Sequence, residues 1–136
     1  MLYPIAIEIG NDNHAYGVVV PDIKGCFSAG DTLDEAIINA KEAIETNLEL
    51  LSENGDLPPN ASDLLKLQSN KEYENLVWAV IDIDIEPYMG KSSKINVTLP
   101  DLLKKKIDDQ VKANSEYKDR SHFLQVAARN ELNKLS

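Results

Sequence analysis

Cysteine and histidine are almost absent from this 136-residue chain, which has a single cysteine, Cys26, and two histidines, His14 and His122. One cysteine excludes an internal disulfide or a zinc–thiolate cluster and suits a reducing cytosol. The distant histidines offer little to metal catalysis. No apolar run approaches the roughly 18–20 residues that cross a bilayer, and the first residues lack the basic segment of a signal peptide. We therefore expect a cytoplasmic protein without a membrane span.

Basic residues are scarce in the first two thirds of the chain. The whole chain has 14 Lys and Arg against 23 Asp and Glu, a formal net charge of −9. Residues 1–90 hold four basic and 17 acidic residues, a net −13, whereas residues 91–136 hold ten basic and six acidic residues, a net +4. This asymmetry predicts two modules with partners of opposite charge.

A short stretch rich in Pro, Gly and Ser, PYMGKSS, begins at Pro87 and separates the two charge regions. Such a composition is typical of a flexible linker. We therefore predict a first domain over 1–87, a linker over 88–93 and a second domain over 94–136.

The first domain alternates short extended segments with one long helical pattern. Period-two alternation of apolar residues and turn signals between them predict four strands. Thr32 and Glu35 form a capping-box pattern ahead of an apolar stripe at three- and four-residue spacing, and Gly55 is a plausible stop. The predicted order is β-β-β-α-β, an α+β fold with strands over 2–9, 15–20, 26–28 and 76–85.

The turn and helix-start residues of this domain resemble those of a known family. Between Pro21 and Ala36 the chain reads PD-x-x-GC-x-x-x-GDT-x-x-EA, preceded by Tyr3-Pro4 and by YGVVV from Tyr16. As a set, these residues resemble the HicB family of bacterial and archaeal antitoxins over roughly the first third of the chain. The resemblance implies a pared-down ribonuclease H fold.

A ribonuclease H fold raises the question of nuclease chemistry, which needs several carboxylates converging on divalent metal ions. Glu8, Asp12, Asp22, Asp82 and Asp84 are the acidic candidates, and Asp82 and Asp84 share one face of the predicted strand. No spacing matches a metal-ligand motif. We therefore expect no catalytic residue, no metal and no cofactor, and we take Glu8, Asp12, Asp82 and Asp84 as candidate contacts to a basic protein partner.

The second domain reads as a strand followed by two helices. Residues 94–99 alternate polar and apolar side chains before Pro100, and apolar residues recur at four-residue steps over 101–112. Ser121 is the expected cap of a second helix that runs to about residue 135. About 45 residues are too few to bury a stable core alone. A strand without a partner in its own module points to pairing with a second chain.

This segment resembles the ribbon-helix-helix DNA-binding family, to which some HicB-type antitoxins fuse their C-terminus. In that family two chains contribute one strand each to an antiparallel ribbon that enters the major groove. The resemblance implies that Lys94, Asn96 and Thr98 face base edges. It also implies that Arg120 and Ser121 meet a phosphate at the N-terminus of the second helix.

Together the two resemblances imply a non-enzymatic antitoxin. It would sequester a HicA-type toxin, a small basic RNA-cleaving protein, and repress its own operon by binding operator DNA as a homodimer or a pair of dimers. The alternative is a stand-alone ribbon-helix-helix regulator whose first domain senses a ligand or only assembles the protein, with no toxin. A degenerate ribonuclease is a third hypothesis. A short basic reading frame beside this one would favour the antitoxin.

Overall fold

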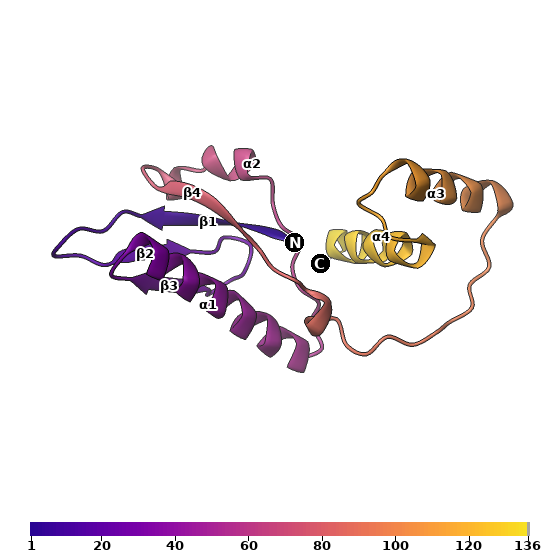
Figure 1. Ribbon diagram of the computed structural model, residues 1–136, viewed down its shortest axis with the longest axis horizontal. Coiled ribbons are helices and arrows are strands. Elements are labelled where there is room, and N and C mark those ends of the chain that lie inside the picture. The colour runs from indigo at the N-terminus through magenta and orange to yellow at the C-terminus, as the bar shows by residue number, and fades with distance from the viewer. Residues whose placement is uncertain (136) are drawn as a thin grey trace. The chain divides into compact units, whose positions relative to one another are not determined.

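The computed structural model describes residues 1–135 and divides the chain into two compact units, Met1–Gly90 and Lys91–Ser136 (Figure 1). Ser136, the last residue of the predicted second domain, lies outside the described residues. The first unit combines a sheet with a long helix, so the predicted α+β class is confirmed.

The sheet of the first unit has four strands in the order β3-β2-β1-β4, and each strand is antiparallel to its neighbours. Its central strand β1 pairs with β2 on one side and with β4 on the other. The strands are β1 (Leu2–Glu8), β2 (Tyr16–Val19), β3 (Phe27–Gly30) and β4 (Val77–Asp82). A short helix α2 (Leu64–Gln68) and the 3-10 helices η1 (Lys71–Tyr73) and η2 (Glu86–Tyr88) complete the unit.

Helix α1 (Leu33–Glu53) begins and ends where the sequence predicts. The Thr32 hydroxyl oxygen accepts a hydrogen bond from the backbone N–H of Glu35 at 3.1 Å and caps the helix. At the other end Gly55 adopts φ +79°, and its N–H and that of Asp56 donate to the carbonyls of Ser52 and Leu51. This is the Schellman arrangement, which satisfies the last helical carbonyls.

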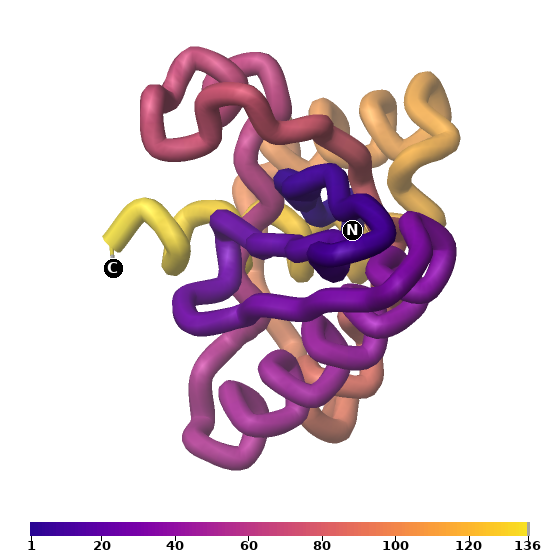
Figure 2. Tube along the Cα trace, turned by 90° about the vertical axis from the view of Figure 1, so that its left-hand side faces the viewer, coloured from indigo at the N-terminus to yellow at the C-terminus, as the bar shows by residue number. Residues whose placement is uncertain are grey.

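One face of α1 packs on one face of the sheet, as Figure 2 shows from the side. The sheet contributes alternate residues of β1, because successive side chains of a strand point to opposite faces. The buried residues of α1 recur every four residues and share a face. The buried core contains Tyr3, Ile5 and Ile7 of β1, Val18, Val20, Ile23, Cys26, Ile81 and Ile83, together with Ala36, Ala40, Ile44 and Leu48 of α1.

The N-terminal part of α1 lies very close to β3. A Cβ atom added at Gly30 would lie 2.4 Å from the backbone nitrogen of Ala36, a distance that real side chains do not reach. The absence of a side chain at Gly30 and the small side chain of Ala36 therefore allow the helix to cross the edge of the sheet at this point.

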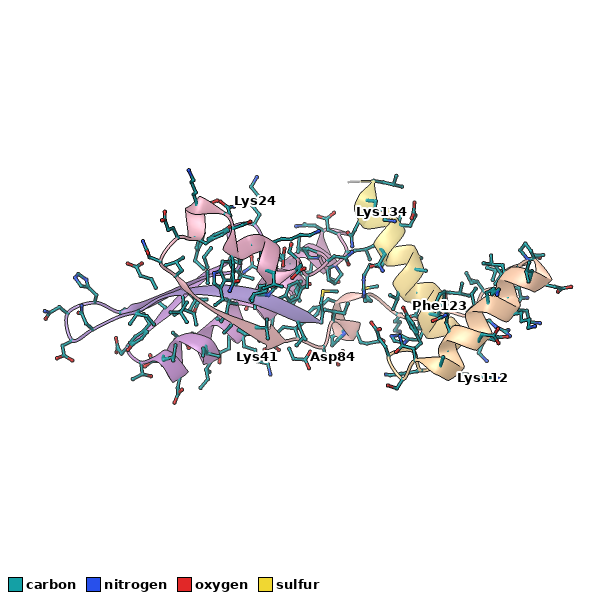
Figure 3. All side chains as sticks on the ribbon, turned by 90° about the horizontal axis from the view of Figure 1, so that it is seen from above. Lys24, Lys41, Asp84, Lys112, Phe123 and Lys134 are labelled. Carbon is teal, nitrogen blue, oxygen red and sulfur yellow. The ribbon has the colours of Figure 1, made fainter. Side chains whose placement is uncertain are left out.

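Strand β4 ends at Asp82, three residues before the predicted end. Its partner β1 begins at Leu2, which pairs with Asp82. Beyond that pair, the Ile83 N–H donates to the Met1 carbonyl at 2.8 Å and the Met1 amino group donates to the Ile83 carbonyl at 2.7 Å. Asp84 lies beyond the strand (Figure 3), so the prediction that Asp82 and Asp84 share a strand face is wrong.

The second unit contains helices α3 (Asp101–Ala113) and α4 (Arg120–Lys134). The predicted strand over 94–99 is not formed within this chain, because residues 91–100 have no ladder partner among the described residues. The predicted cap of α4 is also wrong. The helix begins at Arg120, and the carboxylate of Asp119, not the hydroxyl of Ser121, accepts the first-turn N–H of His122 at 2.8 Å.

Few contacts hold α3 and α4 together. Within the described part of this unit Ile107 alone is a buried hydrophobic residue. The rings of Tyr117 and Phe123 lie 4.8 Å apart, centre to centre, and an ion pair joins Arg120 to Asp108. The unit thus has too small a core to fix its helices by burial alone.

The close approach at Gly30 gives a first prediction. Gly30→Ala should lower the free energy of unfolding by about 1–3 kcal/mol, because the new methyl group pushes α1 away from β3. Gly17→Ala, on the neighbouring strand, is the matched control, since its nearest contact would be an ordinary 3.8 Å from the Glu8 carboxylate. Urea unfolding followed by the fluorescence of the single tryptophan, Trp78, measures both. Equal losses in the two variants would refute the tight contact.

Candidate interfaces for nucleic acid and for a protein partner

The segment ahead of α3 presents both polar and apolar side chains to solvent. Lys94, Asn96 and Thr98, the predicted base-reading residues, are all exposed. Ile95 and Val97, which alternate with them, are 77% and 59% exposed. Apolar side chains at this density on a water-exposed segment indicate a surface that another molecule covers.

The helices of the same unit add to this apolar surface. Four leucines remain about half exposed or more, although a unit of this size needs its apolar residues for stability. In a single chain, therefore, the second unit leaves several large apolar side chains uncovered. The four are Leu102 at 69% and Leu103 at 49% in α3, and Leu132 at 53% and Leu135 at 78% at the end of α4 and just beyond it.

The N-terminus of α4 is more complex than the sequence indicates. Ser121 is exposed in the first turn, and it is free to meet a ligand from solvent. Asp119 places a carboxylate at the same helix end, where negative charge is favourable to the helix dipole but repels a phosphate. The predicted phosphate site therefore holds one carboxylate that the sequence analysis did not take into account.

Arg120 is paired with a carboxylate of the preceding helix. Its Nε and Nη2 groups donate to the two carboxylate oxygens of Asp108 at 2.9 and 2.8 Å. This hydrogen-bonded guanidinium lowers the pKa of Asp108 below its ordinary value, and the nearby lysines Lys104 and Lys112 lower it further. The carboxylate in turn raises the pKa of Arg120.

Sequence reasoning missed Asp108 and Asp119 as parts of this region. Asp119 has a local signal, because an aspartate three residues ahead of the N–H it accepts is a common helix cap. Asp108 has none, because it lies 12 residues from Arg120. Their contact depends on how the connection between α3 and α4 folds.

The acidic candidates of the first unit lie in two groups at opposite ends of β1. Glu8 ends the strand and Asp12 lies in the following turn, whereas Asp82 pairs with Leu2 at the beginning of the strand. Seven strand residues separate the groups by about 20 Å. All four predicted carboxylates, including Asp84, are exposed.

Each acidic group has further carboxylates or polar residues around it. Asp12 lines a polar surface pocket together with His14, Tyr16 and Asp31. At the other end Tyr88 of η2 is near Asp84 and two glutamates of α1. Burial raises the pKa of the Tyr88 phenol, and the charges of Glu45, Glu49 and Asp84 raise it further. Both ends of the sheet thus present negative charge.

The carboxylates that a nuclease would need are not gathered. Asp22 accepts hydrogen bonds from the backbone N–H of Ser62, at 2.8 Å, and from the Ser62 hydroxyl, and thereby holds the segment after α1. Asp82 contacts the amino group of Met1 at 3.3 Å. Within residues 1–135, no three His, Cys, Asp or Glu side chains come together as metal ligands.

None of the helices described here combines the length and apolar character that a bilayer span requires.

An α+β unit with a large excess of acidic residues, followed by a basic two-helix unit with uncovered apolar side chains, defines a class of protein that works by binding partners. The comparison with known protein families identifies one family within this class. Residues 3–128 match the model described as "HicB_like antitoxin of bacterial toxin-antitoxin system", and the chain belongs to this antitoxin family.

Relatives and solved structures agree with this family. A 14.9 kDa protein from the rep-hol intergenic region of Haemophilus phage HP1 is 46% identical over 132 residues, 97% of this chain and 98% of that protein. The crystal structure of the Burkholderia pseudomallei antitoxin HicB is 40% identical, covers 98% of this chain and 99% of its own, and has a TM-score of 0.76. A chain of a HicA3 and HicB3 toxin-antitoxin complex is 30% identical over 62% of this chain and 99% of its own, with a TM-score of 0.52.

Cys26 gives a second prediction. The side chain is 1% exposed, and burial raises the pKa of its thiol, so the thiolate is disfavoured at neutral pH. We expect native protein to react with iodoacetamide at least roughly a hundredfold more slowly than free cysteine, because the reactive form needs local opening. Mass spectrometry follows the labelling, and the same protein in concentrated urea is the control. Fast labelling of the folded protein would contradict the buried position.

Proposed function

We propose that this antitoxin neutralises a HicA-type toxin through its first unit and represses its own operon through its second. The supporting observation is the division of charge, net −13 over residues 1–90 and net +4 over residues 91–136, in a chain of the HicB family. A negative unit attracts a basic protein, and a positive unit attracts DNA. Both activities are binding functions without catalysis.

The antitoxin activity belongs to the sheet-and-helix unit. It is supported by the likeness of this chain to a chain of the HicA3 and HicB3 toxin-antitoxin complex. The β-β-β-α-β order is also consistent with a pared-down ribonuclease H fold. Glu8, Asp12, Asp82 and Asp84 are exposed, and they give two acidic contact regions for the basic surface of the toxin. In this way the unit competes with RNA for the toxin.

The repressor activity requires a second copy of the chain. Residues 94–99 of two chains pair as an antiparallel ribbon, which gives these residues the ladder partner that one chain lacks. Ile95 and Val97 then face the helices, and they cover the leucines that are exposed in the single chain. A homodimer, or a pair of dimers, forms through residues 94–136, with 88–93 as the linker to the first domain, 1–87.

Pairing of the two strands leaves Lys94, Asn96 and Thr98 on the outer face of the ribbon. Lysine donates to guanine O6 and N7, asparagine pairs with adenine, and threonine contacts a thymine methyl group or a base edge. Ser121 and the first-turn amides of α4 lie at a helix N-terminus, which favours a phosphate. Together they bind operator DNA in the cytoplasm, where both the toxin and the operon are found.

The strand assignment gives a third prediction. Replacement of Lys94, Asn96 and Thr98 by alanine should weaken binding to the DNA upstream of the reading frame by at least about a thousandfold, since each specific base contact contributes roughly 1–3 kcal/mol. Toxin binding and the dimer should remain. Fluorescence anisotropy with labelled duplexes and size-exclusion chromatography measure these properties. Lys104→Ala/Lys105→Ala/Lys106→Ala, which removes more positive charge, is the control. Operator affinity retained by the strand variant would refute the assignment.

The acidic contacts give a fourth prediction. Neutralisation of Glu8, Asp12, Asp82 and Asp84 to the corresponding amides should slow association with the toxin by roughly 10- to 100-fold at low salt. The matched control neutralises four other exposed carboxylates and changes the net charge equally: Glu42, Glu53, Asp56 and Glu74. Stopped-flow association over a salt series separates local contact from overall charge. Equal slowing in both variants would contradict the proposed contact regions.

A further inference from the structure

Arg120 contacts Asp108, which raises the question of whether the arginine binds DNA or holds the two helices together. A guanidinium at the start of α4 is well placed for a DNA phosphate, which is the role that the sequence implies. In the structure two of its N–H groups are directed at one carboxylate in the side-on, bidentate geometry that makes arginine–carboxylate pairs specific. Arg120 can either bind a DNA phosphate or hold α4 against α3, and the two roles predict different effects of substitutions.

We propose that Arg120 is a positioning residue of the second unit, the DNA-binding arm. Its bidentate ion pair with Asp108 fixes the start of α4 against α3, and Arg120 does not bind phosphate. This inference rests on the proposed DNA-binding function and deepens it. It assigns to Asp108, a negatively charged residue in a basic arm, a role that favours DNA binding.

The ion pair between Arg120 and Asp108 is important because the hydrophobic core of the arm is small. Ile107 is the one buried hydrophobic residue among those described in the unit, and the Tyr117–Phe123 ring contact lies next to the connection between the helices. Figure 3 labels Phe123 in α4 and Lys112 near the end of α3. With so little burial, a directional contact between the helices determines where the first turn of α4 lies. The position of Ser121 and of the first-turn amides then depends on the pair.

The charges around Asp108 also support a positioning role for the ion pair. Lys104 and Lys112 lie one turn before and one turn after it on α3, so Asp108 is placed between two cations. Without the carboxylate, the guanidinium of Arg120 would face these lysines and would be repelled. The ion pair as a whole carries no net charge, so it contributes little to the counterion release that drives phosphate binding.

The two roles predict opposite effects for the removal of one negative charge. If Arg120 is a phosphate ligand, Asp108→Asn frees it, and DNA binding becomes tighter and more salt-dependent. If Arg120 positions α4, the same substitution weakens binding although it makes the arm more positive. Asp109→Asn is the matched control, because Asp109 is exposed, adjacent, and has no recorded ion pair within residues 1–135.

The experiment uses the full chain and a fluorescein-labelled duplex of the DNA upstream of its reading frame, with a scrambled duplex of equal length for comparison. We expect Asp108→Asn to weaken binding to the upstream duplex by about tenfold, the size of one well-placed contact, with the dependence on salt unchanged. Arg120→Lys keeps the charge but cannot form the bidentate contact, so it should lose as much. Asp109→Asn should bind as tightly as the wild type or more tightly.

Tighter binding by Asp108→Asn, with a slope of log affinity against log salt steeper by about 0.9 for each copy of Arg120 in the complex, would overturn the proposal and make Arg120 a phosphate ligand. Wild-type affinity in Arg120→Lys would also overturn it. If the wild-type chain binds both duplexes equally or neither, the failure lies in the proposed repressor function and not in the ion pair.

Amide hydrogen exchange tests the structural half of the proposal without DNA. Asp108→Asn and Arg120→Lys should both speed exchange in the first half of α4, by a similar factor, and Asp109→Asn should not. Exchange at the wild-type rate in both variants would show that the pair does not hold the helix, and it would overturn the proposal whatever the DNA measurements give.

Discussion

The packing of α1 against one face of the sheet is the contact on which the first unit depends. The buried side chains of the helix recur every four residues and end at Leu48, and they meet alternate residues of β1 and β4. Because the apolar residues are used in this contact, the many carboxylates of the unit remain outside. An apolar interior thus carries a unit of net charge −13, which suits the proposed capture of a basic toxin.

The second unit is constructed on the opposite principle. Ile107 is its one buried hydrophobic residue among those described, and six large apolar side chains remain exposed: Ile95, Val97, Leu102, Leu103, Leu132 and Leu135. A second chain would complete both its core and its ladder, so folding of the arm and formation of the DNA-binding surface would be one event. In its proposed role, the exposed, bidentate Arg120–Asp108 pair fixes the geometry where hydrophobic packing supplies little.

Much of the first unit could be predicted because its signals are local. Thr32 ahead of Glu35, the four-residue recurrence in α1 and Gly55 at its end depend only on neighbouring residues. The end of β4 could not be predicted, because β4 pairs with β1, whose residues lie about 80 positions away along the chain, and a local pattern does not show the register. Alternating side chains continue beyond Asp82, but the hydrogen-bonding partner does not.

The candidate sites show the same division. Lys94, Asn96 and Thr98 are exposed, and so are Ile95 and Val97 between them, so the single chain does not separate the two faces of the predicted strand. The sequence names the acidic candidates without placing them, and the antiparallel sheet puts them at both ends of β1. Neither that separation nor the pairing of Arg120 with Asp108 has a sequence signal, because each depends on tertiary structure. The sequence was enough to predict which types of residue form the candidate sites. The contacts that these residues make depend on the tertiary structure.

The most direct test of the account is an affinity purification of the tagged full chain from its native host, with the bound proteins identified by mass spectrometry. The account predicts a stoichiometric, small, basic companion that arrests growth when it is expressed alone and that does not do so when it is expressed with this chain. Recovery of the chain alone, or with DNA only, would contradict the antitoxin function and leave a repressor without a toxin.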